Sequence, residues 1–198
     1  ALDIIGKMFR LGIRVLQKLG LTNGIGDVDL PVDAVKKIED LKNDAFKDVE
    51  KFIEIYRKGE LVAYPGKTIE ETLEIKILEL LNKVRNAIGH IVAQYTSGDN
   101  QMLILINSGA RGNLLNLAQM AACVGQQSLR GQRIRNGYKN RTLSHFKQGD
   151  LGYKARGFIE RGFRDGLDPH EFFFGAMTGR DSLMDTALRT PKSGYLYR

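Results

Sequence analysis

The sequence has one cysteine, four prolines and no tryptophan among its 198 residues. A single thiol, Cys123, excludes a disulfide framework and indicates an intracellular or simply unpaired cysteine, because no secretory signal precedes it. No run approaches 18 apolar residues without a charge, so no membrane-spanning helix is predicted. A hydrophobic content of 42% is still enough for a core in one or two domains. Ala1 in place of an initiator Met leads us to expect a piece of a larger assembly.

Several catalytic signatures are also missing. The glycine-rich stretch LTNGIGDVDLP has too few hydroxyls and lysines for a phosphate loop, so we interpret it as a turn. The chain has no Cys/His set spaced for zinc, and its histidines, His90, His145 and His170, are isolated. We expect these histidines to serve packing or the surface, and no metal to bind this chain.

Positive charge is concentrated in one segment. The net charge is +7, but residues 111–164 contain eleven Lys or Arg against Asp150 and Glu160 and so carry +9. This segment is either the part that meets a polyanion or a solvated basic surface.

Apolar residues recur every three or four positions in three N-terminal segments, which predicts helices over 1–19, 32–57 and 68–95. Gly20 ends the first helix, and Thr68 with Glu71 forms a capping box that opens the third. The second and third helices each have one apolar stripe and a short connection around Pro65 and Gly66. They therefore predict an antiparallel hairpin.

A run of small residues follows, NSGARGNLLNLAQMAACVGQQ, with Arg111 as its one basic residue. A guanidinium framed by Gly109 and Gly112 can reach phosphate oxygens, or the glycines only make a tight turn. AQMAACVGQQ predicts a helix ending at Gly125. The amides of Gln126 and Gln127 then either bind a partner or cap the turn.

The C-terminal segment 168–198 predicts one long helix. Asp168 is placed to cap it, Pro169 occupies the first turn, and Glu171 follows. About 30 residues would extend roughly 45 Å, which is too long for a helix packed inside a domain of this size. Its apolar residues surround the helix axis, which predicts burial on every side. Pro191 predicts a kink or a loosened turn after Ala187.

These stretches together resemble a known family. SGARGNLLNLAQMAACVGQQSLRGQRI, RTLSHF and KARGFIERGFRDGLDPHEFFFGAMTGRDSLMDTALRTPKSGYLYR closely resemble the largest subunit of multisubunit DNA-directed RNA polymerases, nearest to its archaeal A-prime form. The resemblance extends over essentially all 198 residues. It implies a mainly α fold with four parts. These are a pore-side helix and connection (1–30), a funnel hairpin (31–98), a basic pore-floor segment with short strands (99–165) and a bridge helix (166–198).

The resemblance also implies roles for particular residues. Arg111 would contact the triphosphate of the incoming nucleotide. The residues of the bridge helix that would face template or nucleotide are Thr186, Ala187, Thr190, Pro191, Tyr195 and Arg198. The residues matching an inhibitor pocket, which binds a mushroom toxin in eukaryotic relatives, are Gln119, Cys123, Val124, Gly125, Gln126, Gln127, Ser128, Gly131, Arg133 and Asp181.

Thr186 and Thr190 are four residues apart and therefore share a helix face, where small side chains and hydroxyls would let a base pair slide past. The sequence departs from the family at Gly175 (usually His), at Thr178 and Ser182 (usually Gly), at Tyr197 (usually Gln) and at Pro191 (usually a small residue).

The implied enzyme is a nucleotidyltransferase that carries out DNA-templated RNA synthesis. Its Mg²⁺ ions would be bound outside this chain, because the family's NADFDGD metal loop does not occur in this sequence. No catalytic residue is therefore expected here, and the chain alone should be inactive. Expected partners are the other polymerase subunits, including the second-largest, DNA template, RNA transcript, nucleoside triphosphates and transcript-cleavage factors, but no membrane. The expected location is the archaeal cytoplasm, or the nucleus if the source is eukaryotic.

Two other functions are compatible with the residues alone. One is an independent coiled-coil module whose basic segment binds RNA nonspecifically. The other is a stand-alone nucleotide-binding enzyme that uses the Arg111 loop, although neither a P-loop nor a metal cluster accompanies that loop.

Overall fold

The computed structural model describes residues 1–135 and 137–198, and most of them are helical. The helices, including one 3-10 turn, are α1 (Leu2–Leu19), η1 (Ile25–Val28), α2 (Val32–Lys58), α3 (Ile69–Tyr95), α4 (Gln101–Asn107), α5 (Leu114–Ala121) and α6 (Pro169–Tyr197). The strands are β1 (Gly125–Gln126), β2 (Ser128–Leu129), β3 (Gln132–Arg133) and β4 (Phe158–Ile159). The predicted mainly α fold, with short strands and a long C-terminal helix, is confirmed.

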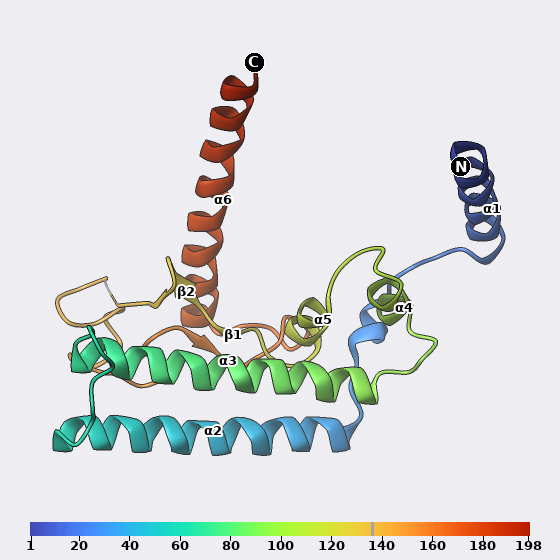
Figure 1. Cartoon of the computed structure of the whole chain (residues 1–198). Helices are drawn as coiled ribbons and strands as arrows, with labels where there is room; N and C mark the ends of the chain where they lie inside the picture. Colours follow the sequence, from blue (N-terminus) through green and yellow to red (C-terminus); the bar gives the residue numbers. More distant parts are fainter. Residues whose placement is uncertain (136) are drawn as a thin grey trace.

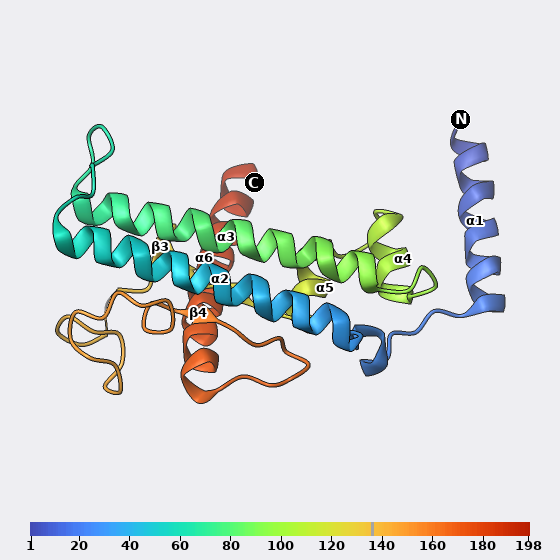
Figure 2. The ribbon, with the colours of Figure 1, turned by 90° about the horizontal axis from the view of Figure 1, so that it is seen from below.

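Helices α2 and α3 lie antiparallel and side by side, as the two apolar stripes predicted (Figures 1 and 2). Each helix contributes a buried row to their contact. The members of the two rows are Ala34, Ile38, Ala45, Val49 and Ile53 from α2, and Leu73, Ile77, Leu81, Val84, Ile88 and Val92 from α3. The hairpin is thus held by burial of apolar side chains, while most of the Lys, Asp and Glu side chains of α2 are exposed and Lys42 and Asp48 are partly buried.

The ends of the hairpin helices follow local rules. Gly59 terminates α2 in the left-handed conformation at φ 76°, which costs glycine little. Thr68 Oγ1 accepts the amide of Glu71 at 3.2 Å, and Glu71 Oε2 accepts the amide of Thr68 at 3.0 Å. The predicted capping box is therefore confirmed, and it satisfies donors that the first helical turn leaves free.

The short helix α5 ends earlier than the sequence predicted. The expected end at Gly125 is wrong, because the helix stops at Ala121 and the next residues pair with a distant segment. The amide of Val124 donates to the carbonyl of Arg161, and Gly125 and Gln126 pair antiparallel with Ile159 and Phe158. This strand pairing satisfies backbone groups that a longer helix would have satisfied internally.

Helix α6 leaves the body of the molecule at its first turns and projects away from it (Figure 1). Only Glu171 and Phe174 of this helix are buried. The described residues of this chain therefore do not bury α6 on every side, although its sequence predicted such burial. The helix begins at Pro169 after Asp168, as predicted. It also continues through Pro191 to Tyr197 as one element, although Pro191 has no N–H to donate, and the kink or loosened turn predicted between Ala187 and Pro191 stays a prediction.

Helix α1 stands apart from the hairpin in both ribbon views (Figures 1 and 2) and has no buried residue. Its large apolar side chains are exposed, including Leu2, Met8 and Phe9. Among the described residues, no helix combines the length and the apolar character that crossing a membrane requires.

Candidate functional site

Arg111 lies in the turn between α4 and α5. Gly109 at φ 71° and Gly112 at φ 77° both adopt the left-handed conformation, and the amides of Ala110 and Arg111 donate to the carbonyl of Leu105. The glycines therefore do make a tight turn, as one of the two interpretations held. The turn also leaves the Arg111 side chain exposed to solvent, where it can reach an anion.

The turn around Arg111 is anchored on its far side by Asn113. The Oδ1 atom of Asn113 accepts the amide of Asn116 at 2.8 Å and so caps α5. Because α5 packs on α3 through the fully buried Leu117 and Ala118, the loop is attached to the hairpin and not to the projecting helix.

Five of the six residues predicted to face template or nucleotide lie on the exposed C-terminal half of α6, and the sixth, Arg198, directly follows the helix. The hydroxyl of Thr186 donates to the carbonyl of Ser182 at 3.0 Å, and that of Thr190 donates to the carbonyl of Thr186 at 3.0 Å. Both hydroxyl protons are donated to carbonyls of the helix itself. What this face can still present to a ligand is the hydroxyl oxygens, as hydrogen-bond acceptors, and the threonine methyl groups. Ala187, Pro191, Tyr195 and Arg198 follow one another at spacings of four, four and three residues and form an adjoining face.

A groove of about 480 Å³ lies between the β2–β3 hairpin and α6. Two of the residues predicted for the inhibitor pocket, Ser128 and Asp181, line it from opposite sides. Arg130 Nε approaches Asp181 Oδ1 at 3.9 Å across the groove. Both side chains are substantially exposed, so we expect this ion pair to contribute little stability.

The other predicted pocket residues lie behind or beside this groove. Cys123, Val124, Gly125 and Gln126 are buried, and Gln119 Nε2 donates to the carbonyl of Val124 at 3.3 Å. The two adjacent amides, Gln126 and Gln127, differ in their contacts. Gln126 Nε2 donates to the carbonyls of Gln127 and Arg156, whereas Gln127 is only partly buried. Gln126 thus stabilises the β1–β4 region.

Gly131 and Arg133 line a separate cavity of about 220 Å³ beside α3. Arg133 is 2% exposed and its Nη1 atom lies 3.4 Å from Glu74 Oε2, while Nη2 donates to the carbonyls of Leu151 and Gly152. Burial lowers the pKa of Arg133 to about 10, and the carboxylate of Glu74 opposes that shift. Arg133 thereby joins the hairpin to the basic segment.

Sequence reasoning missed Glu74 as the partner of Arg133. The signal was present, because Glu74 precedes Ile77, Leu81, Val84 and Ile88 on the same stripe of α3 at helical spacing. A single carboxylate at a core position of a hairpin needs a buried cation. The sequence reasoning also missed Arg130 and Thr178, which line the groove, because no local pattern brings a β-turn to a helix.

Cys123 is buried and its thiol donates to the carbonyl of Ile159 at 3.2 Å. Burial raises the pKa of the Cys123 thiol to about 11. The thiol is thus protonated at neutral pH and packs β1 against β4, with no signature of a nucleophile.

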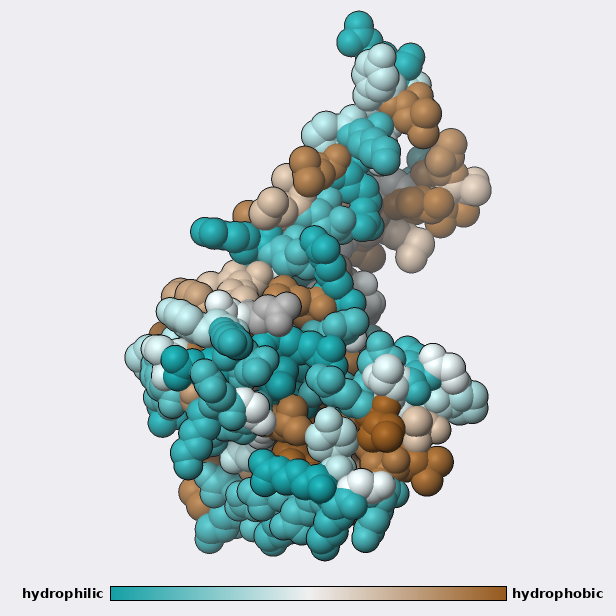
Figure 3. All heavy atoms as spheres, turned by 90° about the vertical axis from the view of Figure 1, so that its left-hand side faces the viewer, coloured by the Kyte–Doolittle hydropathy of each residue, from teal (hydrophilic) through white to brown (hydrophobic). Residues whose placement is uncertain are grey.

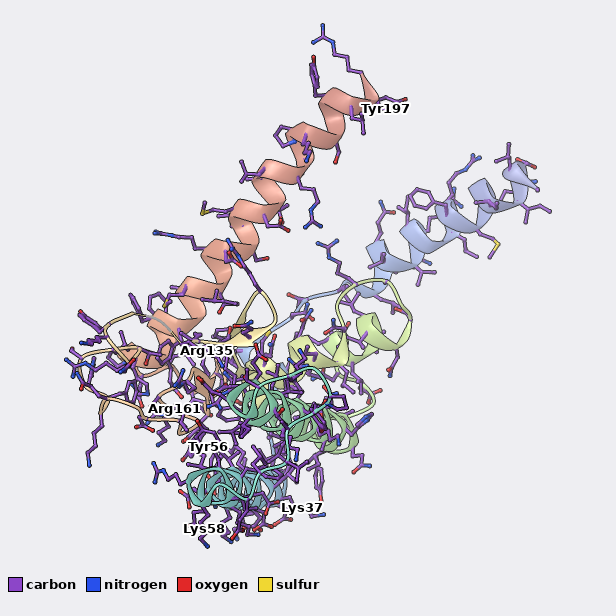
Figure 4. The ribbon with its side chains drawn as sticks, turned by 60° about the vertical axis from the view of Figure 1, so that its left-hand side comes forward. Lys37, Tyr56, Lys58, Arg135, Arg161 and Tyr197 are labelled. Carbon is purple, nitrogen blue, oxygen red and sulfur yellow. The ribbon has the colours of Figure 1, made fainter. Side chains whose placement is uncertain are left out.

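The basic segment covers one side of the first turns of α6, where Glu171 and Phe174 are buried, and leaves Phe172 and Phe173 exposed. In Figure 4 Arg161 lies near the foot of α6, and its Nη1 atom contacts Asp168 Oδ1 at 3.1 Å, whereas Arg135 Nη2 lies 3.5 Å from Glu70 Oε1 of α3. Within residues 1–135 and 137–198, no three His, Cys, Asp or Glu side chains are grouped as a metal site requires. The described part of the chain can therefore offer anion contacts, but it has no set of ligands for a metal.

Comparison with known proteins decides the family. A family model described as RNA polymerase Rpb1, domain 4, matches residues 53–159, and one described as RNA polymerase Rpb1, domain 5, matches residues 166–198. The chain belongs to the Rpb1 family of RNA polymerase subunits. The two Rpb1 matches divide near the start of α6, where the body of the molecule ends and the projecting helix begins.

Three relatives of this chain carry the name DNA-directed RNA polymerase subunit Rpo1N. That of Halococcus morrhuae is 47% identical over 98% of this chain and 56% of its own length. That of Thermococcus celer is 46% identical over 100% of this chain and 22% of its own length, and that of Methanocaldococcus jannaschii is 47% identical over 96% and 14%. The chain therefore spans about half or less of these relatives.

Proposed function

We propose that this chain is part of the largest subunit of an archaeal-type DNA-directed RNA polymerase and contributes to DNA-templated RNA synthesis. The observation that carries the proposal is the match to Rpo1N proteins, at 46–47% identity, over nearly the whole chain. The projecting α6, whose Leu183, Met184 and Leu188 side chains are left exposed by the described residues, agrees with a place among other subunits.

In this proposal each part of the chain has its own task. Residues 31–98 form the rim of the funnel through which nucleotides enter and transcript-cleavage factors reach the active centre. Residues 99–165 form the floor of that pore, residues 1–30 lie beside it, and residues 166–198 form the bridge helix across the cleft. Other polymerase subunits, including the second-largest, would cover α1 and α6.

Arg111 is proposed to contact the triphosphate of the incoming nucleotide. An exposed guanidinium on a turn fixed by two left-handed glycines can make a charge-assisted hydrogen bond without a large change in the loop. Thr186, Ala187 and Thr190 are proposed to lie beside the templating base. Because the hydroxyl protons of both threonines are bound within the helix, that face would hold a base pair weakly and let it move on. Pro191 and Tyr195 would lie on the adjoining face, and Arg198 would contact phosphates, a contact independent of sequence.

Nucleotidyl transfer in the whole enzyme is proposed to use Mg²⁺ held outside this chain. The described residues do not fit such an ion, since they offer no cluster of carboxylates, and no catalytic step is assigned to them. The groove lined by Ser128 and Asp181 is proposed as the part of the inhibitor-type pocket that is open to a ligand. The buried residues, including Cys123 and Gln126, would shape its wall.

The test of this function is the variant Arg111→Ala in the assembled polymerase. We expect kcat/KM for nucleotide addition to fall by one to two powers of ten, since a charge-assisted hydrogen bond is worth about 1.5–3 kcal/mol. The matched control is Arg57→Ala, which removes an exposed guanidinium from the last turn of α2. Equal kinetics for both variants would remove Arg111 from the nucleotide site.

A second test asks whether the chain has the proposed partners. The longer protein that contains this sequence, purified by an affinity tag from its native cells, should bring the other polymerase subunits with it in stoichiometric amounts. Mass spectrometry identifies them. A preparation without any other polymerase subunit would contradict the proposal and favour an independent RNA-binding module.

A further inference from the structure

The carboxylate of Glu171 holds the base of α6. Glu171 is 3% exposed, and its two oxygens accept two different backbone amides. Oε1 accepts the amide of Glu160 at 2.8 Å, and Oε2 accepts the amide of Asp168 at 3.0 Å. One side chain in the first helical turn thus binds both the residue that precedes the helix and the segment that leaves β4.

The segment that contains Glu160 is itself attached to the hairpin helix α2. Lys42 Nζ donates to the carbonyl of Glu160 at 3.3 Å. The ring of Phe46 stacks on Tyr153 with centroids 3.8 Å apart and meets Phe158 edge-on at 5.5 Å. A continuous set of contacts therefore leads from α2 through residues 153–160 to the carboxylate of Glu171.

The base of α6 is also held by Phe146, whose ring packs against His170 and Phe174, and by Arg161, which pairs with Asp168. Phe174 is fully buried, and Gly175 lies beside Ile159, where an added Cβ would be in ordinary van der Waals contact, 3.7 Å from its Cδ1 atom. Met177, Thr178 and Asp181 are partly buried, and the helix is exposed from Ser182 to its end (Figure 1). The two buried side chains of the helix, Glu171 and Phe174, lie in its first two turns.

Because α6 is long, a small tilt at Glu171 produces a large displacement at the exposed face that contains Thr186. Thr186 lies 15 residues beyond Glu171, which is about 22 Å along the helix at 1.5 Å per residue, so a tilt of about 5° at the base displaces Thr186 by about 2 Å. A misplacement of about 1 Å at a reacting centre can reduce a rate a hundred-fold. A small change in the direction of the helix at Glu171 therefore causes a large displacement of the face proposed to lie beside the template.

We propose that Glu171 is a positioning residue, whose buried carboxylate joins α6 to the hairpin helix α2 through Glu160 and thereby sets the placement of Thr186 and Thr190. This inference rests on the proposed function of α6 in the polymerase. It assigns to the hairpin a second task, which is to hold the helix that faces the template.

The test uses the assembled polymerase with Glu171→Gln. The amide keeps one acceptor oxygen, but its NH₂ group faces a backbone N–H that the carboxylate had bound. Hydrogen exchange of the amides in 158–174 should become about ten-fold faster, as expected for one lost buried hydrogen bond. The kcat of single-nucleotide addition should fall about ten-fold, with the nucleotide KM unchanged within two-fold.

Two further variants make the test specific. Thr72→Val removes an equally buried polar contact at the start of α3, where Thr72 Oγ1 accepts the amide of Tyr64 and donates to Thr68, and it should change neither readout. Lys42→Met breaks the link from α2 without burying a new charge. It should change hydrogen exchange in 158–174 and kcat in the same direction as Glu171→Gln but by less. If Glu171→Gln does not assemble, the Lys42→Met result tests the proposal instead.

Three results would overturn the proposal. One is unchanged exchange in 158–174, which would mean that Glu171 does not hold the base of the helix. Another is faster exchange with unchanged kcat, which would leave Glu171 a structural residue only, while the Arg111 result would still support the proposed function. The third is an equal loss of kcat in Thr72→Val, which would indicate general destabilisation.

Discussion

Arg133 and Cys123 are two buried residues of the basic segment, one charged and one neutral. Arg133 is accommodated by Glu74 and by two backbone carbonyls, whereas Cys123 is accommodated as a neutral group. Buried ion pairs are expensive to form and more expensive to break. These residues therefore permit sharp tests of the packing between the hairpin and the basic segment.

Glu74→Gln should strongly destabilise the contact between α3 and β3. The variant leaves the buried guanidinium of Arg133 without its counter-charge, and removal of one partner of such a pair costs about 3–5 kcal/mol. Midpoints of thermal or urea unfolding of the assembled enzyme should fall accordingly. The double variant with Glu74→Gln and Arg133→Met removes both charges and should recover much of the loss. A double variant no more stable than Glu74→Gln would contradict this account of the pair.

Cys123 should resist alkylation in the native protein. Its pKa is raised by burial from 9.0 to about 11, so at pH 8 the thiolate fraction is about 100-fold smaller than for an ordinary thiol. Iodoacetamide labelling of the Cys123 peptide, followed by mass spectrometry, should be slow in the native enzyme and fast in urea. Rapid labelling of the native enzyme at pH 8 would show that the β1–β4 region opens freely.

The same shift predicts a pH dependence of stability. The folded state holds the thiol proton more tightly than the unfolded state, so between pH 9 and about 11 the folded state binds more protons. The contribution of Cys123 to stability is therefore fully present below pH 9 and is lost as pH rises through 11. In Cys123→Ala, the free energy of unfolding should no longer show this decrease between pH 9 and about 11 when it is measured as a function of pH.

At the scale of secondary structure, elements defined by local signals were predictable and those defined by pairing were not. Helices α1, α2 and α3 were found from apolar periodicity and from their terminal glycines and caps. The end of α5 at Ala121 was not, because Val124 and Gly125 are drawn into contact with residues 159–161, more than 30 positions away. A strand of two residues has no sequence period of its own, so only the folded chain reveals it.

The candidate site divides in the same way. The exposed positions on α6 were predictable as a face, because i and i+4 spacing needs nothing beyond the helix. The groove was only partly predictable, since Ser128 and Asp181 meet there through the placement of a β-turn against a distant helix. The role of Glu171 depends on a backbone amide of a distant segment, and that of Glu74 on the side chain of Arg133, so neither partner could be named from the sequence.

Pro191→Ala should make α6 more rigid without changing its path. The helix is already continuous through Pro191, and alanine supplies the N–H that the carbonyl of Ala187 lacks. The intrinsic preference favours alanine by about 3 kcal/mol in a helix interior. In the assembled polymerase we expect altered elongation rate and pausing with normal subunit composition. Failure to assemble would instead indicate that Pro191 packs against a partner.

The whole molecule has a folded body and two helices that this body does not cover. The body is the hairpin with α5 and the basic segment, whose cluster of buried apolar residues extends from Val28 to Phe158. Figure 3 shows a mainly hydrophilic surface over the body and several hydrophobic residues in the part of the molecule that lies above it. A chain that exposes so much apolar surface on two isolated helices is not arranged to remain alone in water.

The isolated chain should therefore self-associate. Leu183, Met184 and Leu188 are 70%, 56% and 70% exposed on α6, and most of the large apolar residues of α1 are similarly open. We expect light scattering coupled to gel filtration to report species larger than the 22.2 kDa monomer at micromolar concentration. Replacing Leu183, Met184 and Leu188 by Ser, and deleting 1–19, should shift the chain towards the monomer while its helical circular dichroism falls only by the deleted helix. The matched control replaces exposed Lys47, Lys51 and Lys58 of α2 by Ser and should leave association unchanged. A wild-type chain that is monomeric throughout would mean that α1 and α6 need no partner, and it would remove the main structural support for a place among other subunits.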